Sequence, residues 1–148
     1  MQDLELEGKI RLLEQEVYSL KDELKKVTEQ MYLLALVKVP EPRFPYWNWL
    51  ILNRYSEEDR QKLELILRLF SAKVEKESIM EAYINKAQQM NITINLEGEV
   101  DCKTIQATFQ QNFGIGKENL ETLFTALYNQ SVFKEFSEYA LQELKKCH

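Results

Sequence analysis

Apolar residues at heptad spacing fill the first quarter of the chain, and this pattern constrains the fold more than any other feature. Nine apolar side chains follow one another at intervals of four and three residues between Leu6 and Leu34. This spacing places them on one narrow stripe of an α-helix, which is the pattern of a coiled coil. We name these nine residues the seam: Leu6, Leu13, Leu20, Val27 and Leu34 at heptad position d, and Ile10, Val17, Leu24 and Met31 at position a.

The charges beside the seam favour self-association of parallel chains. Lys9 at position g would face Glu14 at position e of a second chain, and Glu16 would face Lys21 in the same way. The sequence therefore predicts a coiled-coil oligomerisation helix over residues 1–38 and a homo-oligomer, either a dimer or a trimer. The alternative is a long amphipathic helix packed on its own domain, but such a helix usually has a wider apolar stripe.

Three prolines end this helix. All prolines of the chain lie between residues 39 and 45. Because proline lacks an amide proton and disfavours helix in the residue before it, the long helix should end near Val37. We therefore expect a proline-rich hinge over residues 39–45 and a helical domain over residues 46–148.

An aromatic cluster follows this hinge. A short helix is expected over residues 46–53, and two tryptophans that lie two positions apart on a helix cannot share a face. We expect Trp47, Leu50 and Ile51 on one face and Trp49 and Leu52 on another. One tryptophan should then pack into the domain core while the other contacts a neighbouring chain or a partner; the alternative assigns the whole cluster to the core. The candidate contact residues are Phe44, Tyr46, Trp47, Trp49 and Tyr55.

The remaining sequence predicts further helices. Ser56 begins a capping box for a helix that reaches about Lys76. The helical period resumes over residues 80–90, either as a separate helix or as the same helix bent near Ser78. Residues 91–96 alternate between polar and apolar, which is the pattern of a β-strand, but the sequence offers no obvious second strand to pair with them. An extended connector or a small hairpin is therefore as good an interpretation as a sheet. Further helices are expected between Asp101 and Gly114 and over residues 119–129 and 132–146. The predicted fold is all-α: an N-terminal coiled-coil helix followed by a compact multi-helix bundle.

The residue types argue against an enzyme. A catalytic nucleophile needs a nearby base, usually histidine, and His148 at the chain end is the single histidine. Cys102 and Cys147 lie far apart and in no CxxC motif, which predicts a reducing compartment. A partly buried Cys102 is favoured over a reactive one. A solvated chain end is favoured over a metal or redox site formed by Cys147 and His148. We expect no catalytic residue, no cofactor and no metal.

Charge bears on the partners. The formal net charge is −5, and both the first 40 residues and the remainder are net acidic, so no electrostatic footprint for nucleic acid is expected. The longest uncharged apolar run, residues 31–37, is too short to cross a membrane. The acidic N-terminus does not resemble a signal peptide. We therefore expect a cytoplasmic protein that binds neither nucleic acid nor membrane.

Two segments carry a family resemblance. These are FPYWNWLILNRYSEEDRQ at residues 44–61 and LETLFTALYNQSVFKEFSEYALQEL at residues 120–144, within which residues 126–130 are most specific. They resemble a family of small Bacillus proteins typified by YhaI, a domain of unknown function. The resemblance implies an all-α oligomeric fold, and it brings no known activity, cofactor or catalytic residue. This chain departs from the family in its longer heptad run and in its NITINLEGE connector.

These observations lead to one functional hypothesis and two alternatives. The hypothesis is a non-catalytic helical protein that self-associates by its coiled coil and binds a protein partner. The first alternative is an inhibitor of a larger enzyme, carried by a phage or mobile element. The second is a DNA-binding regulator dimerised by the coil. This last class needs a basic recognition helix, and residues 54–76, the most basic candidate, hold nearly as many acidic as basic side chains.

Overall fold

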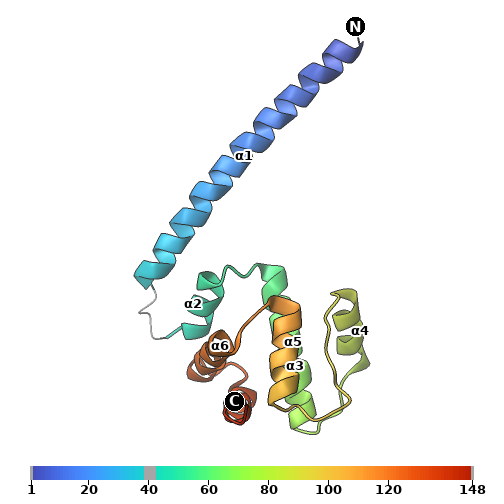
Figure 1. Ribbon diagram of the computed structural model, residues 1–148, viewed down its shortest axis with the longest axis vertical. Helices are drawn as coiled ribbons and strands as arrows, with labels where there is room; N and C mark the ends of the chain where they lie inside the picture. The colour runs from blue at the N-terminus through green and yellow to red at the C-terminus, as the bar shows by residue number, and fades with distance from the viewer. Residues whose placement is uncertain (1, 39–42, 148) are drawn as a thin grey trace. The chain divides into compact units, whose positions relative to one another are not determined.

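The computed structural model describes residues 2–38 and 43–147, and within them every regular element is a helix (Figure 1). The chain divides into two compact units, Met1–Pro40 and Glu41–His148. The first unit holds α1, and the second, which we name the globular unit, holds the other six helices. The all-α prediction is confirmed. The helices are α1 (Gln2–Lys38), α2 (Pro45–Leu52), α3 (Glu57–Val74), α4 (Glu81–Gln89), α5 (Cys102–Phe113), α6 (Lys117–Asn129) and α7 (Lys134–Leu144).

Helix α1 is continuous over 37 residues, which corresponds to a length of about 55 Å. It ends at Lys38, one residue beyond the predicted end. Residues 39–42 of the predicted hinge lie outside the described residues. Pro45, the last residue of that predicted hinge, is the first residue of α2. Proline is well suited to this position, because the first amide of a helix has no intrahelical partner.

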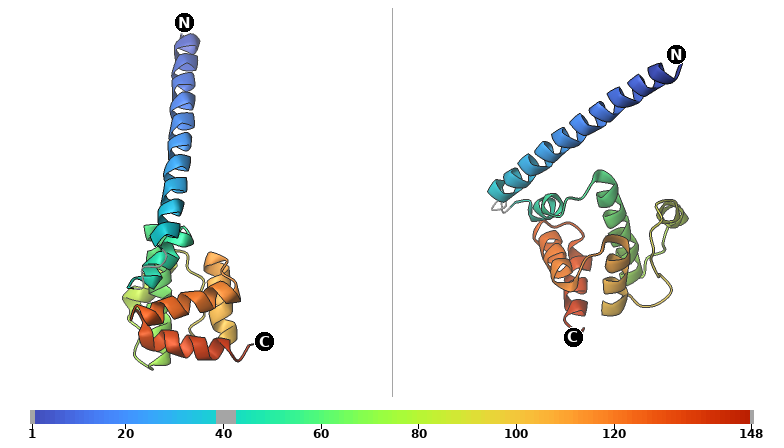
Figure 2. Two further views of the ribbon diagram at one scale, coloured as in Figure 1. Left: turned by 90° about the vertical axis from the view of Figure 1, so that its left-hand side faces the viewer. Right: turned by 45° about the horizontal axis from the view of Figure 1, so that its top comes forward.

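The core of the globular unit joins five of its helices. Tyr46 and Trp49 of α2 pack with residues of α3, α5, α6 and α7 in one cluster. Helices α6 and α7 lie side by side in the views of Figure 2. A second, smaller cluster joins α4 to another face of α3. The largest fully buried side chains of the main cluster are Tyr46, Leu63, Ile66, Leu67, Phe70, Ile105, Phe109, Leu120, Leu123, Phe124 and Leu127.

Local capping signals define two helix starts and one helix end as predicted. The Ser56 side chain accepts a hydrogen bond from the Asp59 amide, and the Asp59 carboxylate accepts one from the Ser56 amide, both at 3.1 Å. Asp101 accepts a hydrogen bond from the Thr104 amide at 2.8 Å, which lowers the pKa of the Asp101 carboxyl. Gly114 ends α5 in the left-handed conformation at φ +66°, which glycine adopts without steric cost.

Two predicted boundaries in the globular unit need correction. Helix α3 ends at Val74 and α4 begins at Glu81, so they are separate helices and not one helix bent near Ser78. The chain leaves α3 through Lys76 in the left-handed conformation. The last helix begins at Lys134, because Phe133 before it is also left-handed.

The connector after α4 alternates as predicted but pairs with no strand among the described residues. Its residues alternate between exposed and partly buried, and Ile92, Ile94 and Leu96 pack on both core clusters. The Thr93 amide donates to the Asn112 side chain at 2.9 Å, and the Asn112 amide group donates back to the Thr93 carbonyl at 2.7 Å. A side chain of α5 therefore supplies the hydrogen bonds that a neighbouring strand would have supplied.

A disulfide joins Cys102 at the start of α5 to Cys147 after α7. The two Cα atoms are 6.1 Å apart although 45 positions separate the residues in sequence. Our expectation of two separate thiols is therefore wrong, and the bond removes the basis of the reducing-compartment prediction. Neither a reactive Cys102 thiol nor a Cys147–His148 pair fits this arrangement, and His148 itself lies outside the described residues. The pairing arises because the folded chain brings the end of α7 back to the start of α5.

We predict that reducing this disulfide lowers the free energy of unfolding by about 4 kcal/mol, because the bond closes a loop of 45 residues in the unfolded chain. Urea unfolding with and without a thiol reductant measures this difference. The double variant Cys102→Ser/Cys147→Ser is the control, and the reductant should leave its unfolding unchanged. Equal unfolding midpoints for the wild-type chain in both conditions would contradict the disulfide.

Candidate functional site

Helix α2 is joined to the rest of the globular unit by side chains that are distant from it in sequence. The start of α2 has no side-chain cap of its own at Phe44. Gln130, directly after α6, supplies one: its Oε1 atom accepts hydrogen bonds from the amides of Tyr46 at 2.8 Å and Trp47 at 3.3 Å. These two bonds satisfy amides that an uncapped helix would leave unpaired.

The other end of α2 is bonded to the start of α6. The Trp49 indole Nε1 donates to Asn119 Oδ1 at 3.0 Å. The amide nitrogen of Asn119 in turn donates to Asn53 Oδ1 at 2.8 Å. Both ends of α2 are thus joined to α6 by side-chain amides, which fixes the rotation of α2 about its own axis.

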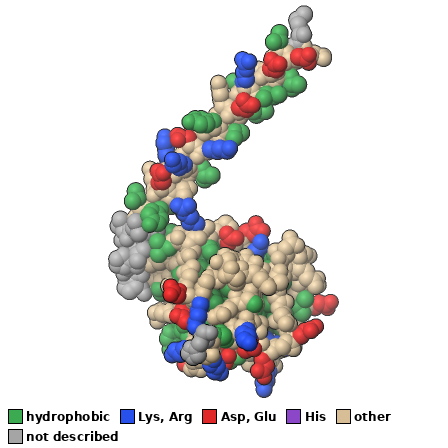
Figure 3. Space-filling model, viewed as in Figure 1, with side chains coloured by type: hydrophobic (Ala, Val, Ile, Leu, Met, Phe, Trp, Pro, Cys, Tyr) green, Lys and Arg blue, Asp and Glu red, His purple; other side chains and the backbone are tan. Residues whose placement is uncertain are grey.

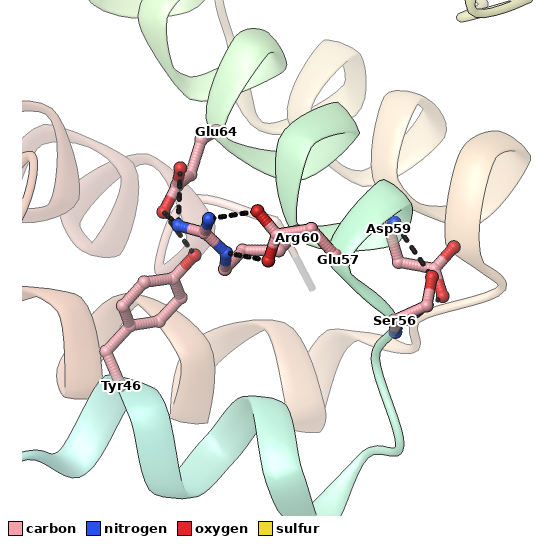
Figure 4. A network of polar contacts seen from close by, with 6 residues as sticks. All are labelled: Tyr46, Ser56, Glu57, Asp59, Arg60 and Glu64. Carbon is pink, nitrogen blue, oxygen red and sulfur yellow. Dashed lines mark hydrogen bonds and ion pairs between the residues drawn. The ribbon is translucent and has the colours of Figure 1, made fainter.

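Tyr46 joins α2 to α3 through a network of polar contacts that Figure 4 shows. Its ring is buried, and its hydroxyl donates to Glu64 Oε1 at 3.2 Å. Arg60 bonds to Glu64 and also to Glu57, one turn earlier in α3. Burial first, and then the neighbouring Glu64 carboxylate, raise the pKa of the Tyr46 hydroxyl well above its usual value. The hydroxyl is protonated at neutral pH, as an unperturbed tyrosine hydroxyl also is, and it donates to Glu64.

The two tryptophans differ as predicted. Trp49 is 4% exposed and Trp47 is 53% exposed, so one ring packs in the core and the other faces outward. The predicted division of the faces holds for Ile51 but is wrong for Leu50 and for Leu52, which is 37% exposed. Leu50 is buried with Trp49, whereas Ile51 shares the exposed side with Trp47. The buried stripe runs through Tyr46, Trp49 and Leu50, and its 3-1 spacing equals that of Trp47, Leu50 and Ile51, so spacing alone does not distinguish the two faces.

Three of the five candidate contact residues belong to the core. Tyr46 and Trp49 are buried in the main cluster, so neither presents its ring to a partner. Tyr55 is partly buried and packs between Trp49 and Phe113, with ring centres 5.0 Å and 5.5 Å apart. Only Phe44 remains exposed beside Trp47.

The exposed side of α2 is an apolar surface, which we name the outer face: Phe44, Trp47 and Ile51. The rings of Phe44 and Trp47 stack with their centres 4.8 Å apart and their planes 6° from parallel. Ile51, one turn further on, is 45% exposed. The guanidinium of Arg43 lies 5.6 Å from the centre of the Phe44 ring. The eight residues of α2 include no Asp, Glu, Lys or Arg.

The seam is the second exposed apolar surface. All nine seam residues are between 46% and 66% exposed in the single chain, and Figure 3 shows hydrophobic side chains along α1. A groove of about 400 Å³ lies on α1 beside Ile10, Leu13, Glu14 and Val17. These four residues occupy positions a, d, e and a, the kind of four-residue hole that receives one side chain of a facing helix in a coiled coil.

Among the described residues, no three His, Cys, Asp or Glu side chains gather as metal ligands. A pocket of about 850 Å³ beside the end of α3 is lined by side chains that include Lys73, Glu77, Glu99 and Tyr139. The Tyr139 hydroxyl is engaged with the Val100 carbonyl at 2.7 Å. Among the residues that the structure describes, no helix is both long enough and apolar enough to cross a bilayer.

Comparisons with protein-family models, with curated proteins and with solved structures find no match. The resemblance to the YhaI-like family therefore stays a prediction. The two segments that carry it do meet in the structure, because Gln130 of the second segment accepts the hydrogen bonds of Tyr46 and Trp47 in the first.

We predict different costs for truncating the two tryptophans. Trp49→Ala should lower the free energy of unfolding of the globular unit by about 3–5 kcal/mol, because it empties a core site and leaves Asn119 without its indole donor. Trp47→Ala should change it by less than about 1 kcal/mol, since the ring is mostly exposed. Urea unfolding followed by circular dichroism measures both, and equal losses would contradict the assignment of the two faces.

Proposed function

We propose that this chain is a non-catalytic protein that forms a parallel homodimer through α1 and acts by binding protein surfaces. The observation that carries the proposal is the seam: nine apolar residues in unbroken heptad spacing, each about half exposed or more in the single chain. Burying one such side chain completely contributes roughly 1.5–3 kcal/mol. A second copy of α1 buries all nine at once, with side chains inserting into grooves such as the one beside Leu13.

The seam composition supports two strands. Two β-branched residues, Ile10 and Val17, occupy a positions, and leucine occupies the neighbouring d positions. Over these heptads the combination favours a parallel two-stranded coil over a trimer, whereas Leu24 at a with Val27 at d does not.

The flanking charges support the parallel orientation. In a parallel dimer Lys9 faces Glu14 and Glu16 faces Lys21, so both of these charged interchain pairs are attractive. In an antiparallel dimer with full overlap Glu16 faces Glu23 of the other chain, which is repulsive. The parallel arrangement therefore has the better electrostatics.

The outer face of α2 supports binding to a protein surface, and a second copy of this chain is such a surface. Stacked aromatic rings are typical of the residues that dominate protein interfaces. The amide contacts from Gln130 and Asn119 hold α2 in place before any contact forms, so little ordering entropy is lost on binding. The acidic net charge and the absence of a basic stripe in the sequence favour a protein partner over a nucleic acid.

We predict that Leu13→Asp/Leu20→Asp converts the dimer to monomers, because two carboxylates per chain would enter the middle of the seam. Multi-angle light scattering gives the mass, and circular dichroism checks that the globular unit stays folded. The matched control is Leu12→Asp/Leu33→Asp. These leucines are 62% and 60% exposed and lie at c positions, off the seam, so the control should remain dimeric.

Two results would contradict the coiled-coil dimer. One is a seam variant that keeps the wild-type oligomeric mass. The other is a wild-type chain that is already monomeric at micromolar concentration.

A further inference from the structure

We infer that the outer face of α2 packs against the outer face of α2 in a second copy of the chain, forming a second interface in addition to the coil. This inference rests on the proposed parallel dimer. The surface that contacts the exposed Phe44–Trp47 pair is then the same pair, together with Ile51, in the other chain.

The size of the face determines what kind of contact it can make. Its three side chains are 36% to 53% exposed. With full side-chain areas of roughly 150–250 Å², they offer on the order of 300 Å² per copy. A stable independent interface buries about 800 Å² on each partner. The outer face is therefore too small to hold a free partner by itself, but it adds stability to a contact that is already held together.

The covalent link between α1 and α2 keeps the outer faces of two copies close together once their α1 helices have paired. Six residues separate Lys38, the end of α1, from Pro45, the start of α2, so the two ends lie at most about 25 Å apart. In a parallel coil both copies of α1 end together, with their axes about 8–10 Å apart. The two copies of α2 then meet at an effective concentration in the millimolar range, which no untethered partner has.

The chemistry of the face suits contact with itself. A two-fold interface places the same patch on both chains, so the patch must be self-complementary. Without a charged side chain, two copies of α2 approach with no like-charge repulsion between them. The two Arg43 guanidinium groups are exposed, so salt screens their mutual repulsion. Aromatic and aliphatic side chains pack favourably on their own kind.

Fluorine NMR on the full-length chain tests this contact. Biosynthetic 5-fluorotryptophan places one label at Trp47 and one at Trp49, and the variant Trp47→Phe assigns the two signals. The difference in chemical shift between H₂O and D₂O reports solvent exposure of each ring. Trp49, which is 4% exposed in the single chain, is the internal control for a buried ring.

The expected result is a small isotope shift at Trp47 in the dimer, close to that of Trp49, and a several-fold larger one in the monomeric variant Leu13→Asp/Leu20→Asp. A dimer of the expected mass with an exposed Trp47 would overturn the inference and leave the proposed coil intact. That result would make the outer face available to a different protein. A Trp47 that is equally protected in dimer and monomer would also overturn it, because its own chain would then cover the ring. A monomeric wild type would overturn the coil and the inference together.

A second measurement uses the dimer dissociation constant from sedimentation. Trp47→Asp should raise this constant at least tenfold, because the substitution brings two carboxylates into the α2 contact. Met80→Asp is the matched control: Met80 is 61% exposed at the start of α4, outside the outer face, and its substitution should leave the constant within twofold. Equal effects of the two substitutions would overturn the inference.

Discussion

A stripe of nine apolar residues along one side of α1 cannot be buried by α1 itself. The stripe is too narrow for the broad contact of a core helix and too regular to be an incidental surface feature. A second α1 is the surface that matches its spacing along the whole length, because both helices then repeat with the same period. In the proposed dimer, the orientation of the two chains, their number and the inferred contact of their α2 helices all depend on this pairing.

Contacts within the globular unit hold a short helix, α2, in a fixed rotation about its own axis. An eight-residue helix is not stable in isolation. Here α2 depends on the buried rings of Tyr46 and Trp49 and on side-chain amides from Gln130 and Asn119. The same contacts that bury Trp49 direct Trp47 outward, so the exposed face of α2 is a consequence of how its other face is anchored.

Features that depend on neighbouring residues could be predicted from the sequence, and those that depend on distant ones could not. The capping box at Ser56, the N-cap at Asp101 and the left-handed Gly114 are signals of three or four residues, and each was located correctly. Gln130 lies 84 positions from Tyr46, and Cys147 lies 45 from Cys102, so no local pattern indicates either contact.

The faces of α2 are a second example of a feature that local sequence alone does not determine. Spacing alone predicts that two tryptophans two positions apart point to different sides, but the choice between them is made by the surface that receives the helix. The seam is the opposite case, because heptad spacing indicates the apolar face and, for the proposed coil, the geometry of the partner helix as well. For this reason the sequence was most informative about α1 and least informative about which residues of α2 remain exposed.

The most direct test of the parallel dimer is a distance between the two copies of α1. Pulsed electron paramagnetic resonance with spin labels on a non-natural amino acid, placed at Gln15 or at Glu29, leaves both cysteines unchanged. These residues share heptad position f, so a parallel in-register dimer gives the same interchain distance at both sites. An antiparallel dimer with full overlap separates the labels along the axis by roughly 10 Å at residue 15 and roughly 30 Å at residue 29. Unequal distances, or no interchain coupling at all, would contradict the parallel coiled coil.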